Sequence, residues 1–345
     1  MFSGFQLRIL YLVGAVVCLF CFIFAAYSLS TADAAAAAEF VPVFQDVSGA
    51  AGISATHTTE LMIIGQAWGD VNQDGWPDLF VTDDEGPNTL YLNDGDSTFS
   101  VSPNNAQVAM PGMVGSGAVF GDYNNDDWPD LYVLNVGPNM LFMNNGGNGF
   151  VDVTSPAGVG DGNRGQTGAW GDYDKDGFLD LYVVNYNCTA CPNGNRDTLY
   201  HNNGDGTFSD VTGALIDQVI RKPGFTGSFL DYDNDGDLDI YVVNDFRTGN
   251  VLWRNDGPGC NYWCFTDVSL SSGADTRVDG MGLAIGDYDI DGDLDLYFSH
   301  NGPAVLLQNQ TSQGSPTFVD GSAAAGVNFA AIGWGTVFFD FDNDG

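Results

Sequence analysis

The stretch GQTGAWGDYDKDGFLDLYVVN, residues 165–185, decides the fold because related stretches recur along the whole chain. In each copy a short Gly-rich, aromatic segment enters a loop of alternating aspartates and leaves through an apolar segment. The other copies begin at residues 65, 115, 225, 280 and 332. The first Asp of each loop falls at 70, 122, 172, 231, 287 and 340, which gives steps of 52, 50, 59, 56 and 53 residues. A period near 50 residues indicates a repeat architecture.

Each period has the same four-strand pattern. A first strand such as GAWGD and a second such as LDLYVVN flank the Asp loop. A third strand follows (NTLYLN, NMLFMN, DTLYHN, NVLWRN), then a hairpin turn such as NNGDGTF, then a fourth strand such as FVDVTS or FSDVTG. Four short antiparallel strands per period predict the blade of a β-propeller. We therefore expect an all-β fold with about five complete blades and one more begun; a β-sandwich would not need six copies in register.

The segment before the first copy resembles a fourth strand. FVPVFQDVSGAAGI, residues 40–53, matches FVDVTSPAGV and FVDGSAAAGV later in the chain. Propellers close their ring by pairing an N-terminal strand into the last blade, which removes exposed sheet edges. Residues 44–47, Phe44 to Val47, are the predicted closing strand.

The Asp loops have the spacing of a metal cage. Each complete loop fits D-x-[DN]-x-[DN]-[GD]-x-x-D, with side-chain oxygens at positions 1, 3, 5 and 9 and a backbone carbonyl at position 7. Gly at position 6 allows the sharp reversal. The predicted ligands are Asp70, Asn72, Asp74, Trp76 and Asp78; Asp122, Asn124, Asp126, Trp128 and Asp130; Asp172, Asp174, Asp176, Phe178 and Asp180; Asp231, Asp233, Asp235, Asp237 and Asp239; Asp287, Asp289, Asp291, Asp293 and Asp295; and, in the unfinished last copy, Asp340, Asp342 and Asp344.

An all-oxygen cage of about six or seven ligands suits Ca²⁺ better than Mg²⁺ or zinc. An EF-hand or dockerin loop is excluded because those loops lead into helices, and here a strand follows. Metal-free Asp turns are the simpler alternative, but three or four carboxylates so close together repel one another. The second loop is expected to be weaker, since Asp127 stands where Gly is usual. The unfinished sixth loop is expected to bind calcium poorly.

The repeats resemble the FG-GAP or VCBS-type repeats of integrin α-chain propellers and of many secreted bacterial proteins. Their FxDVTxxAGV-like strands and NxLYxNNGDG hairpins look closest to the cartilage acidic protein group. The resemblance covers residues 40–345 and implies a seven-bladed propeller in the full protein, with one Ca²⁺ in the first hairpin of most blades. It does not imply an enzyme. The ASPIC/UnbV segment that often follows in that group is not present in this sequence.

The charge of the chain limits its partners. Asp and Glu number 45 against 9 Lys and Arg, a formal net charge of −36, while hydrophobic residues make up 44%. Such a surface repels nucleic acid and anionic membranes, and it favours cations. The hydrophobic fraction is large enough for a core, so the acidity does not indicate a disordered chain.

The N-terminus predicts export. An uncharged apolar run, residues 9–32, follows Arg8, and Ala32-Asp33-Ala34 offers a cleavage site. Residues 1–34 are expected to be a signal peptide or, since the run could span a bilayer, an N-terminal membrane anchor. Residues 35–39 are an alanine-rich linker, and residues 40–345 are the propeller, truncated at its C-terminus. The protein is expected to be secreted, periplasmic or at the cell surface, with membrane contact only through that anchor.

Four cysteines follow the export signal, and strand order indicates how they pair. Cys188 and Cys191 follow a second strand, whereas Cys260 and Cys264 follow a third strand at the opposite end of the blade. Two local disulfides are expected, in keeping with export. A redox C-x-x-C motif is the alternative, but it lacks the helix N-terminus that would lower the pKa of a thiol.

Other side chains give weaker signals. His57, His201 and His300 form no catalytic motif and are expected to be surface or structural residues. Trp68, Trp170 and Trp334 are interpreted as inter-blade packing at equivalent places, and Trp76 and Trp128 as exposed loop residues. Asn187 and Asn309 lie in glycosylation sequons.

No catalytic residue is nominated. The sequence favours a calcium-binding propeller that acts as a non-catalytic extracellular binding or adhesion module, with a protein or glycan as ligand and no nucleic-acid partner. A lectin or a propeller-type secreted enzyme is the alternative.

Overall fold

The computed structural model describes residues 45–54, 65–84, 86–186, 196–215, 222–260, 262–311 and 316–340. The chain divides into two units: one joins residues 1–46 and 339–345, and the other is residues 47–338. Every strand among the described residues lies in the second unit. None of the helices described is long and apolar enough to cross a membrane. The predicted export segment and linker, residues 1–39, fall outside the described residues.

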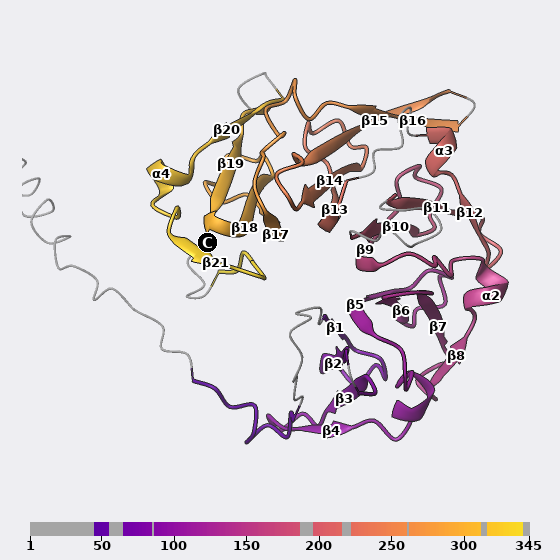
Figure 1. Ribbon diagram of the computed structural model, residues 1–345. Coiled ribbons are helices and arrows are strands. Elements are labelled where there is room, and N and C mark those ends of the chain that lie inside the picture. The colour runs from indigo at the N-terminus through magenta and orange to yellow at the C-terminus, as the bar shows by residue number, and fades with distance from the viewer. Residues whose placement is uncertain are drawn as a thin grey trace, which may run out of the picture. The chain divides into compact units, whose positions relative to one another are not determined.

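The second unit contains five antiparallel sheets, each made of four consecutive strands (Figure 1). This confirms the predicted all-β propeller with five complete blades. Blade 1 is β1 (Gln66–Gly69), β2 (Asp78–Val81), β3 (Thr89–Asn93) and β4 (Phe99–Val101); blade 2 is β5 (Gly115–Gly121), β6 (Asp130–Asn135), β7 (Met140–Asn144) and β8 (Phe150–Asp152); blade 3 is β9 (Gly165–Gly171), β10 (Asp180–Asn185), β11 (Thr198–Asn202) and β12 (Phe208–Asp210); blade 4 is β13 (Gly224–Leu230), β14 (Asp239–Asn244), β15 (Val251–Cys260) and β16 (Tyr262–Asp267); blade 5 is β17 (Gly280–Gly286), β18 (Asp295–Pro303), β19 (Val305–Asn309) and β20 (Phe318–Asp320).

Short helical turns follow several of the fourth strands. They are too short to form a layer of their own, so the second unit is built almost entirely of strands. They are η1 (Asn105–Gln107), α2 (Thr154–Ala157), α3 (Thr212–Leu215) and α4 (Ser322–Ala325).

The residues that follow the first Asp of each second strand are mostly apolar because both faces of this part of the strand are buried between blades. In β6, Leu131 and Val133 pack into the cluster shared with blade 1, whereas Tyr132 and Leu134 pack into the cluster shared with blade 3. All four side chains are fully buried. Truncation of one such side chain, for example Leu131→Ala, is expected to cost about 2–5 kcal/mol. The hydrophobic core is therefore a series of layers between neighbouring blades.

The first strands line the axis and approach one another closely. Contacts run in order from β1 through β5, β9 and β13 to β17. Glycine permits this approach: a Cβ on Gly117 would lie 2.6 Å from the carbonyl oxygen of Gln166, and one on Gly65 would lie 2.5 Å from the Cα of Gly117. A side chain at either place would force the blades apart.

Residues 47–53 form a turn that packs against blade 1. Ala51 N donates to Val47 O and its carbonyl accepts from Phe99 N, both at 2.8 Å. The turn after β16 repeats this arrangement, with Ser272 N donating to Val268 O and Ser272 O accepting from the first residue of β20. The predicted similarity to the end of a fourth strand is therefore correct for this segment.

The predicted closing strand itself is not seen in its described part. Residues 45–47 are not in a strand, because the backbone enters the turn at Val47. Phe44 lies outside the described residues.

One further segment lies against blade 5. β21 (Ala330–Ile332) pairs with β18, and a Cβ on Gly282 of β17 would lie 2.8 Å from the Cα of Gly335. Residues 333–338 therefore take the place of a first strand beside β17. Asp342 and Asp344 of the sixth loop lie outside the described residues, and Asp340 belongs to the other unit.

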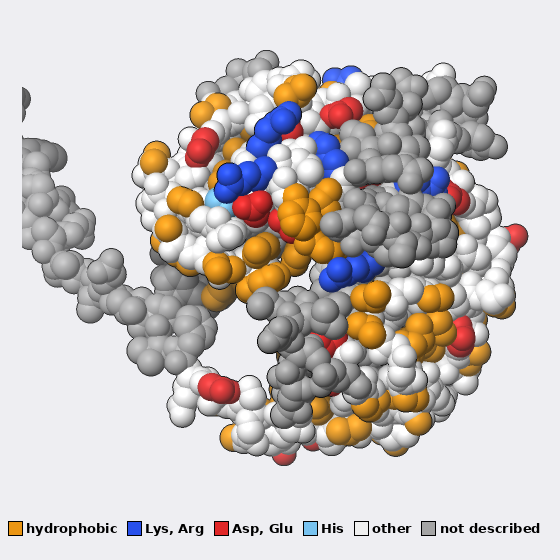
Figure 2. Space-filling view, in the orientation of Figure 1, with side chains coloured by type: hydrophobic (Ala, Val, Ile, Leu, Met, Phe, Trp, Pro, Cys, Tyr) orange, Lys and Arg blue, Asp and Glu red, His pale blue; other side chains and the backbone are white. Residues whose placement is uncertain are grey.

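The two ends of the blades differ in charge. Figure 2 shows a face on which Lys and Arg side chains lie together with scattered Asp and Glu side chains. Among the described residues, five of the nine basic residues of the chain belong to connections at the end of the blades away from the Asp loops, namely Arg164, Arg196, Lys222, Arg247 and Arg277. The acidic loops occupy the opposite end, so the second unit has one strongly acidic face.

Candidate metal centres

The first Asp of each loop holds the turn together through two backbone bonds. In blade 3, Asp172 Oδ1 accepts from Asp176 N and Oδ2 accepts from Gly177 N, both at 3.0 Å. The same pair of bonds occurs in all five complete loops at 2.8–3.1 Å. The position-5 carboxylate in turn accepts from the position-7 N–H at 2.9–3.0 Å. The carboxylates therefore converge because the backbone N–H groups aim them inward.

Two residues per loop are left-handed. Position 6 has φ between 87° and 93° where it is Gly, and Asp127 adopts φ 70° in the second loop, as its position predicted. Position 4 is also left-handed, which the sequence did not indicate. The position-4 residues, with φ between 56° and 59°, are Gln73, Asn125, Lys175, Asn234 and Ile290. A non-Gly residue with positive φ is uncommon, so the backbone of each loop is strained at position 4.

The position-9 Asp anchors each loop to the blade. Its side chain is fully buried in all five blades. Oδ2 accepts from the position-2 N–H at 3.0–3.3 Å, and Oδ1 accepts from the N–H of the Asn that ends the third strand at 2.7–2.8 Å. The position-9 residues are Asp78, Asp130, Asp180, Asp239 and Asp295.

Burial makes these carboxyls hold a proton more tightly than an ordinary Asp. Loss of solvation is the largest cause, and the nearby loop carboxylates add to it, whereas the backbone bonds oppose it. The pKa is raised to about 7 at Asp130, about 8 at Asp180 and Asp239, and about 6 at Asp295; the pKa of Asp78 is also raised. A cation entering the loop must therefore displace protons near neutral pH.

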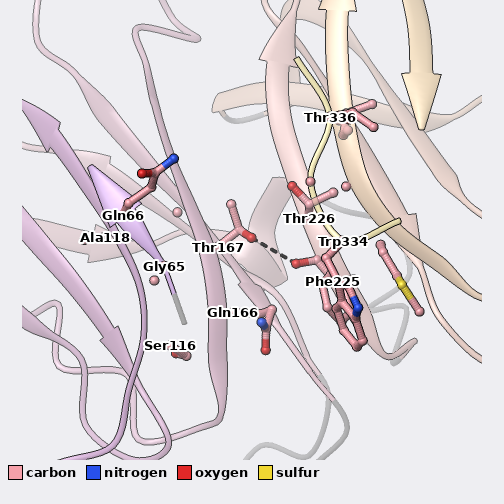
Figure 3. A pocket seen from close by; sticks show the side chains of 16 residues that line it. Gly65, Gln66, Ser116, Ala118, Gln166, Thr167, Phe225, Thr226, Trp334 and Thr336 are labelled. Carbon is pink, nitrogen blue, oxygen red and sulfur yellow. Dashed lines mark hydrogen bonds between the residues drawn. The ribbon is translucent and has the colours of Figure 1, made fainter. Parts of the chain in front are cut away.

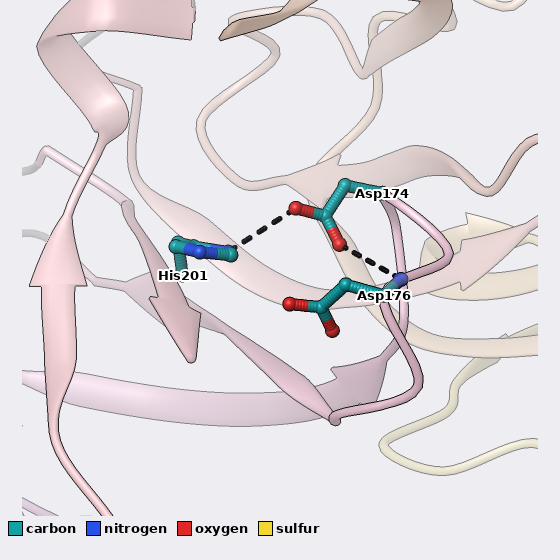
Figure 4. A group of neighbouring side chains, drawn as sticks. All are labelled: Asp174, Asp176 and His201. Carbon is teal, nitrogen blue, oxygen red and sulfur yellow. Dashed lines mark hydrogen bonds and ion pairs between the residues drawn. The ribbon is translucent and has the colours of Figure 1, made fainter. Parts of the chain in front are cut away.

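The position-3 ligand differs between two groups of blades. In blade 3, Asp174 Oδ2 lies 3.4 Å from Nδ1 of His201, a residue of β11 (Figure 4). The same Nδ1 atom lies 3.2 Å from Oδ1 of Asp180. In blade 5, Gln308 Nε2 donates to Asp289 Oδ2. In blade 4, Arg254 opposes the burial that raises the pKa of Asp233. In blades 1 and 2 position 3 is Asn, and the equivalent third-strand residues are Leu92 and Met143.

The donor set fits a hard divalent cation. Three carboxylates bring one oxygen each within 4.8 Å of one another in blades 3, 4 and 5, and the described residues of blades 1 and 2 contain no such trio. In blade 4 one oxygen of Asp233, Oδ1, is buried without a hydrogen-bond partner. An orphan carboxylate oxygen among like charges is the place where a cation would be stabilised. Three of the predicted carboxylate ligands thus lie together in each of blades 3, 4 and 5, and His201 is an additional polar neighbour in blade 3.

Neighbouring loops are bonded to one another. The position-4 side chain of a loop donates to the loop of the next blade along the chain. Gln73 Nε2 donates to Asp127 O at 2.7 Å, and Asn125 Nδ2 donates to Gly177 O at 2.9 Å. In the next two blades the acceptor is the position-7 carboxylate. These contacts are Lys175 Nζ to Asp237 Oδ1 at 2.6 Å and Asn234 Nδ2 to Asp293 Oδ1 at 2.8 Å.

A second set of hydrogen bonds, the backward bonds, joins the third strand of a blade to the loop of the preceding blade. The Asn that ends a third strand donates its Nδ2 to the position-2 carbonyl of the preceding loop, as Asn202 does to Tyr123 O at 2.8 Å. Asn144, Asn255 and Asn309 make the same bond at 2.7–2.9 Å. Sequence reasoning missed these residues, although an Asn at the same place in every third strand was a visible signal. The acidic face is thus one connected belt of loops.

The tryptophans do not all have the predicted role. Trp170 stacks on Tyr123 of blade 2, with ring centroids 6.4 Å apart, which confirms inter-blade packing. Trp68 is 49% exposed and contacts Phe99 of its own blade. Trp334 is not at an equivalent place, because it lies six residues before the loop Asp whereas Trp170 lies two before. That part of the interpretation is wrong. Trp76 is exposed, as expected, whereas Trp128 is half-buried.

The remaining predicted residues have mixed outcomes. His300 is 9% exposed, as a structural residue would be, and Asn309 is fully buried, so its sequon cannot be modified in the folded protein. Cys264 is disulfide-bonded, but the side chain of Cys260 is not described, so their pairing stays a prediction. His57, Cys188, Cys191 and Asn187 lie outside the described residues.

A family model for the FG-GAP-like repeat matches residues 70–133, 122–183, 188–242 and 231–298, which together cover most of the chain. The chain belongs to the FG-GAP-like repeat family. This FG-GAP-like repeat protein is 30% identical over 116 residues to cartilage acidic protein 1 of Mus musculus and 31% identical over 116 residues to that of Homo sapiens. Each match covers 32% of this chain and only 17% of the relative.

Two solved structures are also similar. One is a lectin of Agrocybe aegerita that recognises non-reducing terminal N-acetylglucosamine, with a TM-score of 0.46 and 17% identity over 75% of this chain and 65% of the lectin chain. The other is BBS1N in complex with ARL6, with a TM-score of 0.45 and 13% identity over 81% of this chain and 70% of that chain.

Proposed function

We propose that this FG-GAP-like repeat protein is an exported calcium-binding β-propeller that serves as a non-catalytic extracellular binding or adhesion module. The observation that carries the proposal is the loop geometry, in which backbone N–H groups hold the position-1 carboxylate in the same way in five blades and three carboxylates converge in blades 3, 4 and 5. Oxygen ligands without nitrogen or sulfur from the loop itself favour Ca²⁺.

Calcium would complete the acidic face. Carboxylates within 4.8 Å of one another repel unless a cation or a proton neutralises them. Because the loops are bonded to their neighbours in both directions, an ion that orders one loop also stabilises the two beside it. Bound ions would thus turn the acidic face into a rigid platform that can present residues to a protein or glycan ligand.

The proposed lack of catalysis and the proposed extracellular location are supported by different observations. None of the sixteen residues described as lining the axial cavity is charged, and none is His or Cys. An acid–base enzyme needs such groups near its substrate. Export is supported by the N-terminal apolar run of the sequence and by the disulfide at Cys264. N-terminal sequencing of the protein released by its host would test cleavage near residue 33.

Calorimetric titration of calcium into the chelator-stripped protein tests the proposal. We expect about one ion per complete loop and weak competition by Mg²⁺. Asp180→Asn and Asp239→Asn should each remove one ion from the stoichiometry. Asp205→Asn, on an exposed hairpin outside the loops, is the matched control and should leave the stoichiometry unchanged. No calcium heat, or heat that the loop substitutions leave intact, would refute the metal assignment.

A further inference from the structure

The axis contains a cavity of about 250 Å³ at the end of the blades away from the Asp loops. It is lined by the starts of the first strands of blades 1 to 5 and by residues 334–336, as Figure 3 shows. A second cavity, which shares Thr167, Thr226 and Leu283 with it, continues towards the loops. The cavity is therefore the mouth of an axial channel.

In each of blades 2 to 5 one residue faces this mouth at the same register, six positions before the first loop Asp. In blades 2 and 3 that residue is polar, Ser116 or Gln166, and in blades 4 and 5 it is apolar, Phe225 or Met281. Trp334 occupies the register beside blade 5. Figure 3 shows Ser116 and Gln166 on one side and Phe225 and Trp334 on the other. The mouth thus has a polar half and an apolar half.

The polar half holds an acceptor without a donor. Gln166 is 8% exposed, and its Oε1 is buried with no hydrogen-bond partner. Thr336 Oγ1 in the cavity also lacks a partner. By contrast, Ser116 Oγ donates to Gly165 O, and Thr167 Oγ1 donates to Phe225 O at 2.9 Å. An unsatisfied buried amide oxygen is unfavourable, so a ligand hydroxyl that donates to Gln166 Oε1 would remove that penalty.

The apolar half is an aromatic wall. The rings of Phe225 and Trp334 lie 5.9 Å apart between centroids, at 47° to one another. Trp334 is 43% exposed and so keeps a free surface. Aromatic surfaces of this kind bind apolar ring faces with defined geometry. A matching ligand has one face of C–H groups and an edge of hydroxyls.

The lack of charge among the lining residues further limits the class of ligand. In a chain of formal net charge −36, the sixteen lining residues contain no charged side chain. An ionic ligand would be desolvated here without a counter-ion. The volume is below the range of about 300–1,000 Å³ usual for sites of drug-sized molecules, which fits a single ring.

We propose that the mouth of the axial channel binds one neutral pyranose ring, such as the terminal sugar of a glycan. The C–H face of the sugar stacks on Trp334 and Phe225, and a hydroxyl donates to Gln166 Oε1 on the opposite side. This inference rests on the proposed binding function and names its ligand class. It places the ligand at the opposite end of the blades from the metal loops.

Saturation-transfer NMR and calorimetry with a panel of methyl pyranosides test the proposal. The panel contains the glucose, galactose, mannose, fucose and N-acetylglucosamine glycosides, with glucuronate as a charged comparison. We expect at least one neutral member to bind, with saturation strongest at the ring C–H protons. Trp334→Ala and Gln166→Leu should each weaken binding at least tenfold. Trp68→Ala, at a similarly exposed tryptophan of β1 that does not line the cavity, should change it less than twofold.

Thr336→Val is a conservative second test at the other unpartnered polar atom of the cavity and should weaken binding even if a larger substitution impairs folding; a melting curve checks each variant. The proposal is overturned if no neutral pyranoside binds, if only glucuronate binds, or if the cavity variants bind as the parent does. Calcium titration of the same samples separates the two proposals. Calcium heat without sugar binding rejects only the sugar site, and sugar binding without calcium heat rejects only the metal assignment.

Discussion

The loops of blades 1 and 2 and those of blades 3, 4 and 5 share one backbone geometry but differ at one ligand. In the first group position 3 is Asn and the third-strand residue is Leu92 or Met143. In the second group position 3 is Asp, beside His201, Arg254 or Gln308. The additional carboxylate at position 3 thus occurs only in those complete loops where the third strand of the same blade supplies a polar side chain.

The difference shows how an empty loop tolerates its charge. A fourth carboxylate strengthens the attraction for a cation, but it increases repulsion when the cation is absent. A cationic or hydrogen-bonding third-strand residue reduces that repulsion. Loops of the first group avoid the problem with an uncharged amide, at the expense of cation affinity. We therefore expect two classes of site in one propeller.

Removal of calcium should give the largest effect. At a free concentration one hundred times its Kd, each ion stabilises the fold by about 2.7 kcal/mol. With five loops, chelation is expected to lower Tm by about 10 °C or more, since 1 kcal/mol corresponds to about 2–4 °C in a chain of roughly this size. Calorimetry with EGTA and with Ca²⁺ measures it. An equal Tm in EGTA and in Ca²⁺ would show that neither group of loops binds calcium that stabilises the fold.

The effect of pH should reverse between the metal-free and calcium-bound protein. The pKa of Asp180 and Asp239 is raised to about 8 in the folded state, above the value of about 3.9 for an unfolded Asp. The folded state then binds more protons, so metal-free stability increases as pH falls from about 8 towards 4. Bound calcium is displaced by those protons, so its stabilisation decreases over the same range.

Melting curves at pH 8, 7 and 6 in EGTA and in Ca²⁺ check this reversal. Tm in EGTA should rise by several degrees towards pH 6, while Tm in calcium falls. A metal-free Tm that fell steadily from pH 8 to 6 would show that these buried carboxyls do not control the loops.

The backward bonds between blades should have an intermediate effect. Asn202→Leu removes the donor to Tyr123 O and leaves a buried carbonyl unpaired, which should cost about 1–3 kcal/mol. Asn93→Leu is the matched control, since the bond of its Nδ2 is to Pro77 O of its own blade, on an exposed site. Urea unfolding in calcium compares the two variants. Equal losses would mean that the bond to the preceding loop contributes nothing of its own.

Exchange of the position-3 partners should give the smallest effect and the sharpest test. Asn72→Asp adds a carboxylate beside Leu92, and we expect about fivefold tighter calcium binding with lower metal-free stability, since one more unit charge at 4 Å contributes about 1 kcal/mol in water. Adding Leu92→Gln, as in blade 5, should restore metal-free stability. Site-resolved calcium titration by NMR measures both. If the double variant is no more stable than Asn72→Asp, the third-strand residue does not offset the charge.

The sequence predicted what is local to one repeat. The ligands from Asp172 to Asp180 lie within nine residues, so their spacing alone specifies the cage, and the period specifies the blade. Contacts with residues outside this nine-residue span were missed. His201 reaches the loop from a strand 27 residues after Asp174, and Asn202 bonds a carbonyl 79 residues earlier. Trp334 was assigned by residue type, whereas its register relative to Asp340 places it at the axial mouth. The period of the repeat does not specify which side chains of neighbouring blades contact one another.

The backward bonds also impose an order in time. Each complete position-2 carbonyl bond joins residues 73 to 82 apart, and the donor is always the later residue. A ribosome adding about 5–20 residues per second would release the acceptor roughly 4–16 s before its donor. During that interval a newly made loop is exposed to water and to ions without its final contact. We therefore expect blades to mature in sequence, each completed by the arrival of its successor, so that a pause in synthesis between two blades would prolong the life of one open acidic loop.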